Sequence, residues 1–292
     1  MAAAIVIKDL EWKYEHTTQF ALRGVNLVVP ENTFLGIVGA NEQGKTTLIN
    51  SICGLIPHSF NGIYRGSVEL FGKPVLDMSG LQIATQVGLV FADPESQFTA
   101  MTVEEELVFG LENTGFDLAK IKERLDWAVG VTMIGDLLDK SPYDISGGQK
   151  QRVAIACVLA MNPPIIVMDE PTSMIDPLGK EFIFDILRKL KESGDRTIVV
   201  VEHNVEQLAP LADQLLLMRD GQIAKMAPPA QFFDDLPYVL GSGVYPPEVT
   251  AFAYWLKQAG HLSLAQDLPY RFEDGIEVTR WALGSTALDG AK

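Results

Sequence analysis

Short apolar runs bounded by Gly, Pro or charged residues recur along the chain and predict β-strands. These runs lie at 5–7, 25–29, 34–38, 67–71, 87–91, 165–169 and 197–202. Between the last two, Asp176 and Pro177 predict a helix N-cap and first turn, and Gly194 predicts the end of a helix over 178–193. An apolar run at 215–218, a turn at 219–222 and Ile223 predict a terminal hairpin. Strands that alternate with helices indicate an α/β fold.

The pattern changes twice along the chain, which divides it into parts. Residues from about 93 to 145 are mainly helical in pattern, with Thr102 and Glu105 spaced as a capping box, and predict a helical insertion in the α/β core. A boundary at 227–229 precedes a stretch with one short predicted helix, at 249–258. We therefore predict a main domain over 1–226 and a small C-terminal extension over 227–292.

Composition narrows the class of protein. The chain has 292 residues, 47% of them hydrophobic, and a net charge of −15, which argues against a nucleic-acid-binding face. Cys53 and Cys157 each lie in an apolar helix-like stretch, which favours small buried side chains in a reducing compartment over a disulfide or metal site. We expect no signal peptide and no membrane span, because the apolar runs are far shorter than the roughly 20 residues that a span needs.

The most informative motif follows the run at 34–38. The residues Gly39-Ala40-Asn41-Glu42-Gln43-Gly44-Lys45-Thr46-Thr47 fit the phosphate-loop pattern G-x-x-x-x-G-K-[ST] and open a helix-like stretch. In such a loop, backbone N–H groups and the helix N-terminus surround phosphate oxygens. Lys45 is expected to reach the β- and γ-phosphates and the Thr46 hydroxyl to bind Mg²⁺. The motif predicts a nucleoside triphosphate site.

A second anion-binding turn is expected at Ser146-Gly147-Gly148-Gln149, immediately before an apolar helical run. The hydroxyl and the exposed N–H groups at a helix start can receive an anion. Taken alone, Ser-Gly-Gly more often marks a loop before a helix, so the weight of this site depends on the residues that follow it.

Asp169 and Glu170 follow, at the carboxyl end of an apolar strand, where ligands bind in open α/β sheets. We expect Asp169 to hold Mg²⁺ and Glu170 to orient or deprotonate an attacking water. By itself such a pair is equally typical of a solvated strand end. His203 lies just past the next buried strand, where a histidine is more often structural, but a γ-phosphate sensor there is chemically reasonable.

In this order, over about residues 4–226, the motifs resemble the nucleotide-binding domain of an ATP-binding cassette (ABC) protein. The family's phosphate loop, Gln loop, Ser-Gly-Gly signature, Asp-Glu strand end, second Asp loop and switch histidine match residues 39–46, 92–97, 146–149, 169–170, 173–176 and 203. The resemblance implies an ATPase that uses ATP and Mg²⁺, with Lys45, Glu170 and His203 as catalytic residues. It implies a head-to-tail dimer in which the signature of one subunit closes over ATP held by the other.

Three positions carry further implications of the resemblance. Tyr14 matches the aromatic residue that stacks on adenine, worth about 1–3 kcal/mol, although an isolated Tyr is equally often a core residue. Glu42 and Gln43 stand where the family has small residues, and an extra carboxylate should repel ATP unless it points away or is paired. Ala92 replaces the usual Mg²⁺-binding glutamine, so that either Gln97 substitutes for it or the metal loses one ligand.

Within the family, the segments V-F-A-D-P-E-S-Q-F and T-V-E-E-E-L-V-F-G-L-E-N resemble the cobalt and vitamin importers of the energy-coupling-factor type. Their ATPases carry a C-terminal extension, which residues 227–292 match and which is expected to assist dimerisation. The resemblance implies a second ATPase subunit, identical or paralogous, a membrane coupling subunit and a substrate-binding membrane subunit, with no nucleic acid. It places the chain peripherally on the cytoplasmic face of the cell membrane.

The segment 92–111 is the expected docking surface for a helix of the coupling subunit. Phe98 and Met101 are its expected apolar anchors, or equally they pack under the loop. Glu104, Glu105 and Glu106 are expected to pair with basic residues of the partner.

The alternative within the family is the ATPase of another ABC importer, and two other classes of function also stay open. One is a non-transport ABC ATPase acting on DNA or ribosomes, against which stand the acidity and the single cassette. The other is a regulatory nucleotide-binding module without turnover, motivated by Glu42 and Ala92.

Overall fold

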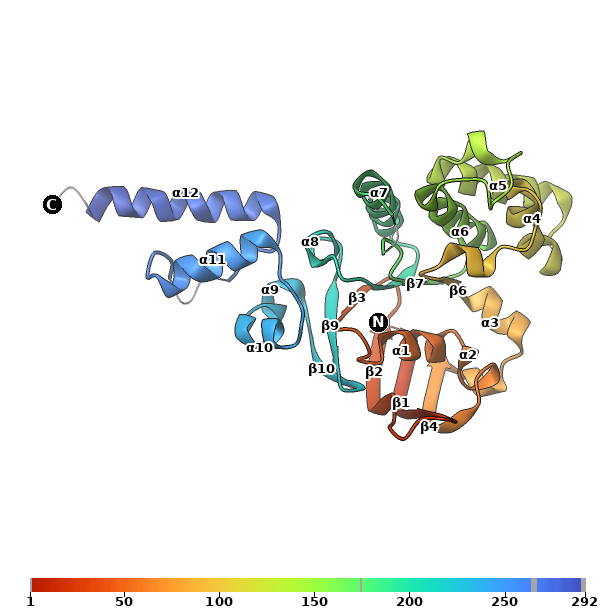
Figure 1. The fold of residues 1–292 in the computed structure, drawn as a ribbon, viewed down its shortest axis with the longest axis horizontal. Coiled ribbons are helices and arrows are strands. Elements are labelled where there is room, and N and C mark those ends of the chain that lie inside the picture. Colours follow the sequence, from red (N-terminus) through yellow and green to blue (C-terminus); the bar gives the residue numbers. More distant parts are fainter. Residues whose placement is uncertain (1, 174, 264–266, 290–292) are drawn as a thin grey trace.

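Two β-sheets form the body of the chain, and the computed structural model describes residues 2–173, 175–263 and 267–289 (Figure 1). An antiparallel sheet has the order β2-β1-β4-β5, with strands β1 (Ala3–Tyr14), β2 (Leu22–Pro30), β4 (Gly62–Leu70) and β5 (Lys73–Pro74). A six-stranded sheet has the order β10-β9-β3-β8-β7-β6, with strands β3 (Phe34–Val38), β6 (Val87–Val90), β7 (Ile165–Asp169), β8 (Thr197–Val201), β9 (Gln214–Arg219) and β10 (Gln222–Ala227). The predicted α/β class is confirmed.

The six-stranded sheet is parallel except for the β9–β10 hairpin at its edge. β3, β7 and β8 are buried along their whole length, because helices or the second sheet cover both faces, as in other parallel sheets. Successive residues of β7 point to opposite sides. Ile166 and Met168 enter the core on the helical side, whereas Ile165 and Val167 enter the core shared with the antiparallel sheet.

The helices group around these sheets. Those nearest the two sheets are α1 (Lys45–Ile52), α2 (Leu55–His58), α3 (Gly80–Gln86), α7 (Pro177–Ser193) and α8 (Val205–Leu208). A separate helical lobe contains α4 (Val103–Asn113), α5 (Leu118–Thr132) and α6 (Gly147–Met161), together with the 3₁₀ turns Pro94–Gln97 and Gly135–Leu137 (Figure 1). A third 3₁₀ turn is Val75–Asp77. The lobe matches the insertion predicted over 93–145 and continues into α6.

The C-terminal extension contains α9 (Pro229–Phe232), α10 (Leu236–Gly241), α11 (Glu248–Gln258) and α12 (Phe272–Asp289). Its first part packs into the body: Phe232, Phe233 and Val244 are buried in the same core as β9. A Cβ atom on Gly243 would lie 3.0 Å from the Cβ of Ala40 in the phosphate loop. In contrast, α11 and α12 project away from the sheets (Figure 1). The division of the chain at residue 227 stays a prediction.

Elements with strong local signals match the expectation closely. Helix α7 has Asp176 as its N-cap, Pro177 in its first turn and Gly194 as its C-cap in the left-handed region. The Thr102–Glu105 capping box forms as predicted, and β9 and β10 form the predicted hairpin. β1 is longer than the predicted 5–7 strand, and α12 was not predicted.

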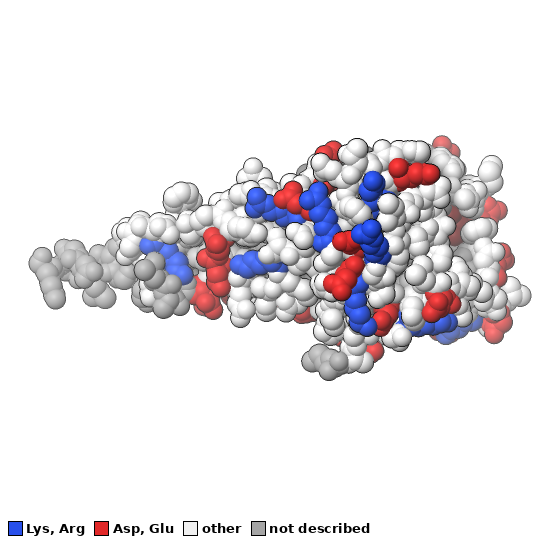
Figure 2. Space-filling model, turned by 90° about the horizontal axis from the view of Figure 1, so that it is seen from below, with Lys and Arg blue, Asp and Glu red and all other residues white. Residues whose placement is uncertain are grey.

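Two expectations from composition can be compared with the structure. Cys53 is buried and Cys157 half-buried, both are free, and burial raises the pKa of each thiol. In the described part of the chain, no helix combines the length and the hydrophobicity needed to cross a membrane. On the face shown in Figure 2, the basic and acidic side chains lie among one another over the sheet-containing body.

Candidate active site

The phosphate loop (39–46) joins β3 to α1, and two of its glycines are required by their surroundings. A Cβ atom on Gly39 would lie 2.5 Å from the backbone oxygen of Met218, and one on Gly44 would lie 2.6 Å from that of Ala21. Both glycines also have positive φ angles, 148° and 94°, which glycine adopts without steric cost. The two positions therefore fix the shape of the loop.

Lys45 is the first residue of α1 and is only 5% exposed. Its Nζ donates to the carbonyl oxygens of Gly39, at 3.0 Å, and Ala40, at 2.8 Å. Burial lowers the pKa of Lys45, and the carboxylates of Glu170 and Asp169 oppose that shift. The first amides of α1 have no partner within the helix and lie at its positive end. The arrangement of Lys45 and these amides is suited to a phosphate chain, and that role stays a prediction.

The two unusual residues of the loop have separate environments. The Glu42 side chain is exposed, and its backbone has a φ of 64°. The Gln43 side chain is turned to the β9–β10 hairpin, where its Oε1 accepts from the Asp220 N–H at 2.6 Å. The Gly221 N–H also donates to the Gln43 carbonyl, at 3.2 Å. Gln43 thus fastens the loop to the hairpin, and the exposure of Glu42 supports a side chain directed to solvent.

We expect Glu42→Gly to change ATP affinity by less than about tenfold, or about 1.4 kcal/mol. The exposed carboxylate is screened by water, and glycine adopts the observed positive φ freely. Calorimetric titration with a non-hydrolysable ATP analogue measures the change. Asn32→Gly, at another exposed position with a positive φ of 58°, is the matched control and should leave the affinity unaltered. A much larger gain in Glu42→Gly alone would show that the carboxylate opposes the nucleotide.

Asp169, Glu170 and His203 lie together at the carboxyl edge of the parallel sheet. Asp169 ends β7, and Glu170 follows it with its N–H donating to the Val201 carbonyl of β8 at 2.9 Å. His203 is two residues past β8, and its Nε2 lies 3.0 Å from Glu170 Oε1. The Glu170 side chain is about a quarter exposed, at 25%, which leaves the carboxylate accessible to water. Glu170 and His203, which follow two different strands, are therefore in direct contact.

Asp169 is 7% exposed, and its Oδ1 has no hydrogen-bond partner among the described residues. Burial raises the pKa of Asp169, a hydrogen bond with the Thr46 side chain lowers it, and the Glu170 charge raises it further. A buried carboxylate oxygen without a donor is costly, and a cation would satisfy it. Since Mg²⁺ prefers oxygen ligands, Thr46 and Asp169 fit this metal.

Tyr14 is the last residue of β1. Its hydroxyl lies 3.2 Å from the Thr47 hydroxyl in α1. Its ring packs edge-on against Trp12 and Phe60, with centroids 5.5 and 6.0 Å away. The structure thus places an aromatic group beside the phosphate loop, and stacking on adenine stays a prediction.

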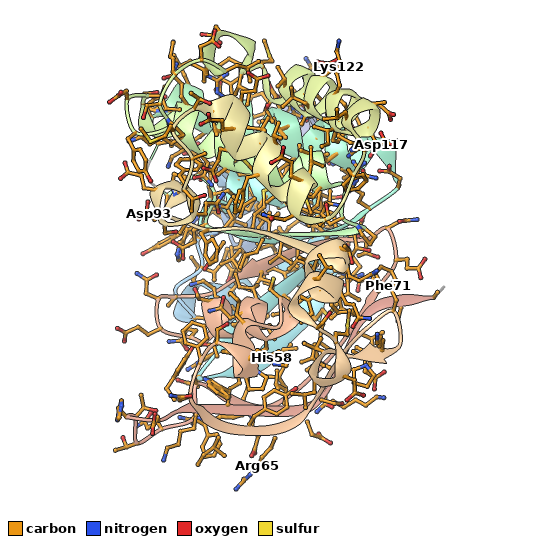
Figure 3. The ribbon with its side chains drawn as sticks, turned by 90° about the vertical axis from the view of Figure 1, so that its right-hand side faces the viewer. His58, Arg65, Phe71, Asp93, Asp117 and Lys122 are labelled. Atoms are coloured by element: carbon orange, nitrogen blue, oxygen red, sulfur yellow. The ribbon has the colours of Figure 1, made fainter. Side chains whose placement is uncertain are left out.

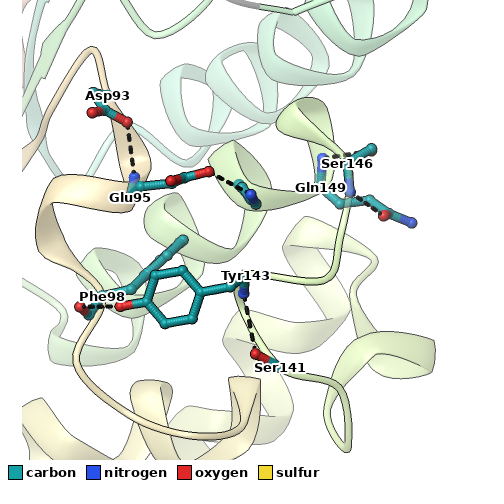
Figure 4. Close-up of polar contacts among 8 residues, drawn as sticks. Asp93, Glu95, Phe98, Ser141, Tyr143, Ser146 and Gln149 are labelled. Atoms are coloured by element: carbon teal, nitrogen blue, oxygen red, sulfur yellow. Dashed lines mark hydrogen bonds and ion pairs between the residues drawn. The ribbon is translucent and has the colours of Figure 1, made fainter.

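The Ser146 turn begins α6 in the helical lobe (Figure 4). The Ser146 N–H donates to Gln149 Oε1 at 2.9 Å, and the Gln149 N–H donates to Ser146 Oγ at 3.4 Å. This capping box uses both side chains locally. The first-turn amides of Gly147 and Gly148 are not part of it, and they face the end of the helix where an anion would bind.

The segment 93–97 follows β6 and is fastened to α6 (Figure 4). Asp93 accepts from the Glu95 N–H at 3.0 Å, and Glu95 forms an ion pair with Lys150 of α6 at 2.5 Å. Gln97 Oε1 accepts from the Phe91 N–H at 3.4 Å. A role for Gln97 as a Mg²⁺ ligand stays a prediction, and its amide is held by the loop itself.

Comparison with known proteins shows the family of this chain. A family model described as ABC transporter matches residues 22–173, about half of the chain. This chain belongs to the ABC transporter family. It is the family's ATP-binding subunit, an ATPase.

Three proteins of known family are similar to this chain over most of its length. The energy-coupling factor transporter ATP-binding protein EcfA1 of Bacillus subtilis is 36% identical over 283 residues, which is 96% of this chain and 97% of the relative. The solved structure of cbiO1 from Clostridium perfringens, described as part of the ABC transporter complex cbiONQ, has a TM-score of 0.72 and 27% identity, over 89% of this chain and 98% of that one. A dimeric ATP-binding cassette in a post-hydrolysis state, bound to ADP and Pi, has a TM-score of 0.68 and 26% identity, over 77% and 98%.

Of the two alternatives left open for Phe98, the structure of this ABC ATPase supports packing under the loop, and it contradicts the expected pairing of Glu106 with a partner. Phe98 is buried, 6% exposed, and its carbonyl accepts from the Tyr143 hydroxyl at 2.9 Å (Figure 4). Glu106 is buried and accepts from the Thr99 and Ala100 amides, while Glu105 serves the capping box. Both carboxylates therefore stabilise their own segment. Met101, 80% exposed, remains available for a partner.

The site also contains a buried pair that the sequence did not predict. Thr172 and Glu202 are 1% and 3% exposed, and the Thr172 hydroxyl donates to Glu202 Oε2 at 2.7 Å. An acidic residue at the end of an apolar strand, next to His203, was the signal available in the sequence. This signal did not indicate that Thr172 is the partner of Glu202, since Thr172 and Glu202 are 30 positions apart.

Proposed function

We propose that this ABC ATPase powers an importer of the energy-coupling-factor type, in which ATP-driven closure of a dimer drives uptake of a vitamin or a transition-metal ion. The observation that carries the hydrolytic role is the 3.0 Å contact between His203 and Glu170, beside the buried Lys45 and Asp169. Similarity to EcfA1 over almost the full length of both chains, and to cbiO1 over 89% of this chain, supports the importer type.

In the proposed reaction, a water oxygen attacks the γ-phosphorus and ADP leaves with the bridging oxygen. Glu170 accepts the proton of this water, a contribution of about 10²–10⁴-fold in rate. His203 holds the Glu170 carboxylate in place and lies where a γ-phosphate would be sensed. Lys45 balances the charge of the phosphates. A Mg²⁺ held by Thr46 and Asp169 would neutralise charge on the β- and γ-phosphate oxygens when bound.

A second ATPase subunit, identical or paralogous, is part of the proposal. The signature turn at 146–149 makes local contacts within the helical lobe, and Figure 1 places α6 apart from α1 and its phosphate loop. A signature from the other subunit would complete each nucleotide site. The exposed Phe252 and Trp255 of α11 make the extension a candidate to add to this dimer.

A groove on the face shown in Figure 3 suits a helix of the membrane coupling subunit. The cavity, of about 510 Å³, lies between the ends of α1, α2, α3 and β6, and its lining includes His58, which is labelled in Figure 3. Its apolar lining includes Cys53, Leu55, Met78, Ile83, Leu89 and Phe91. Phe91 directly precedes the segment 92–111, so that a helix in the groove would continue onto the predicted docking surface. Through Glu95 and Lys150, movement there would be transmitted to the signature helix.

Ala84→Glu tests the groove, because Ala84 lines it and is exposed. We expect the variant to lose copurification with the membrane subunits and ATP-driven uptake, while ATP affinity stays unchanged. Thr85→Glu is the matched control, since it adds the same charge one residue further along α3, about 100° around the helix. Met101→Asp tests the exposed apolar residue of the segment 92–111 in the same way. If Ala84→Glu assembled and transported normally, this groove would have to be abandoned as the docking site.

The proposal places the chain peripherally on the cytoplasmic face of the membrane, in complex with a coupling subunit and a substrate-binding subunit. Copurification with those subunits distinguishes this from an ABC ATPase acting on DNA or ribosomes. A protein that binds DNA or ribosomes presents clustered cations to the phosphate backbone, whereas the face in Figure 2 has basic and acidic side chains interspersed. Steady-state phosphate release distinguishes it from a regulatory module without turnover.

A further inference from the structure

A buried carboxylate lies next to the proposed sensor histidine. Glu202 directly follows β8, and its Oε1 accepts from the backbone N–H groups of His203, at 2.8 Å, and Asn204, at 3.1 Å. Its Oε2 accepts from the Thr172 hydroxyl at 2.7 Å. A charge that is 3% exposed is tolerated only when it is well hydrogen-bonded. These three donors supply that bonding and leave both oxygens engaged.

These contacts join loops that leave neighbouring strands. Thr172 lies two residues past Glu170, in the loop after β7, whereas His203 lies in the loop after β8. The Glu202 backbone is itself fixed by a third strand, since its N–H donates to the Ile37 carbonyl in β3 at 3.2 Å. Glu202 therefore contacts the three segments that lead to the phosphate loop, to Glu170 and to the histidine.

We propose that Glu202 is a positioning residue for ATP hydrolysis. Through its hydrogen bonds rather than its charge, it holds the His203 loop against the Thr172 loop, which keeps His203 within reach of Glu170. The proposal rests on the roles proposed above for Glu170 and His203, and it gives Glu202 no contact with the nucleotide. Its effect on rate follows from geometry, because small displacements of groups around a reacting centre are costly.

Two substitutions at position 202 separate hydrogen bonding from charge. Glu202→Ala removes the acceptors of all three donors, and we expect kcat of the full-length ATPase to fall by about tenfold or more, with KM for ATP unchanged. Glu202→Gln keeps one oxygen for the two amides, and its NH₂ group can donate to the Thr172 hydroxyl, which then acts as acceptor. We expect Glu202→Gln to retain most of the activity. An equal loss in both variants would show that the charge matters and would overturn the proposal.

Substitution of the partner tests the same contact without altering the carboxylate. Thr172→Val keeps the shape of the side chain but removes the hydroxyl, and should lower kcat in the same direction as Glu202→Ala. Thr172→Ser keeps the hydroxyl and should have the same kcat as the unaltered protein. Unchanged kcat in Thr172→Val would show that this hydrogen bond has no part in the mechanism, even if kcat falls in Glu202→Ala.

A double-mutant cycle distinguishes positioning from a general effect on the fold. If Glu202 acts through His203, Glu202→Ala should cause no further loss in a His203→Ala background, whereas independent effects would multiply. Full activity of His203→Ala would refute the proposed role of the histidine and this inference with it. Reduced activity of His203→Ala beside normal activity of Glu202→Ala would refute this inference alone.

Amide hydrogen exchange provides a readout that does not depend on turnover. Thr172→Val should accelerate exchange of the His203 and Asn204 amides, whose acceptor is then less firmly held, while the amides of β8 keep the exchange rate of the unaltered protein. Equal acceleration in the loop and in β8 would indicate loss of stability throughout the sheet and would contradict a positioning role.

Discussion

Glu170→Gln should bind ATP with unchanged affinity while kcat falls by about 10²-fold or more, because the amide cannot accept the proton of the attacking water. Glutamine has the size of glutamate and can still hydrogen-bond His203 Nε2, which lies 3.0 Å from Glu170 Oε1. The arrangement of the site should therefore survive the change. Steady-state phosphate release measures kcat, and size-exclusion chromatography with ATP should reveal an accumulating ATP-bound dimer.

Asp117→Asn is the matched control for this variant. Asp117 caps α5 in the helical lobe (Figure 3), and asparagine is an equally good N-cap, so one carboxylate is lost far from the nucleotide. Its kcat should equal that of the unaltered protein. Unchanged phosphate release in Glu170→Gln would remove Glu170 from the proposed mechanism.

Lys45→Ala should weaken ATP binding itself, by about tenfold or more. The buried ammonium is the cation held inside the phosphate loop, and its contacts with the phosphates are charge-assisted. Calorimetric titration with an ATP analogue measures the affinity. Thermal unfolding gives a second measurement, since a ligand at 100 times its Kd stabilises the folded state by about 2.7 kcal/mol, and weaker binding removes part of this.

Lys122→Ala is the corresponding control, because Lys122 is exposed on α5 in the helical lobe (Figure 3). It should preserve both affinity and the thermal shift. If Lys45→Ala retained the same affinity as Lys122→Ala, the assignment of residues 39–46 as the phosphate site would be wrong despite the match to the motif.

Features with local causes were predictable from the sequence. The ends of α7 follow from Asp176, Pro177 and Gly194, whose conformational preferences act within one turn of the helix. The hairpin at Asp220 and Gly221 follows from residues that accept positive φ. The phosphate loop and the Asp169-Glu170 strand end were likewise recognisable, because each motif is contiguous.

Features that depend on distant contacts were not predictable. β1 extends to Tyr14 because the antiparallel sheet buries Leu10 and Trp12 on one face, although charged residues interrupt the apolar pattern. For Phe98 the sequence left a docking surface and packing under the loop equally open, because the hydrogen bond between its carbonyl and Tyr143 joins segments 45 residues apart. The Thr172–Glu202 pair has the same character, and no spacing rule in the sequence connects its members.

The packing of α9 and α10 bears on the smallest form of this ATPase that could fold on its own. The recognisable motifs of the chain end at His203. A fragment cut to contain only the motifs and the rest of the sheet would therefore stop near β10. Such a fragment would lack Phe232 and Phe233 and would leave the part of β9 and β10 that they cover in water. It would also lose Gly243, which lies beside Ala40 of the phosphate loop. We therefore expect the unit that folds to extend beyond the segment that carries the motifs.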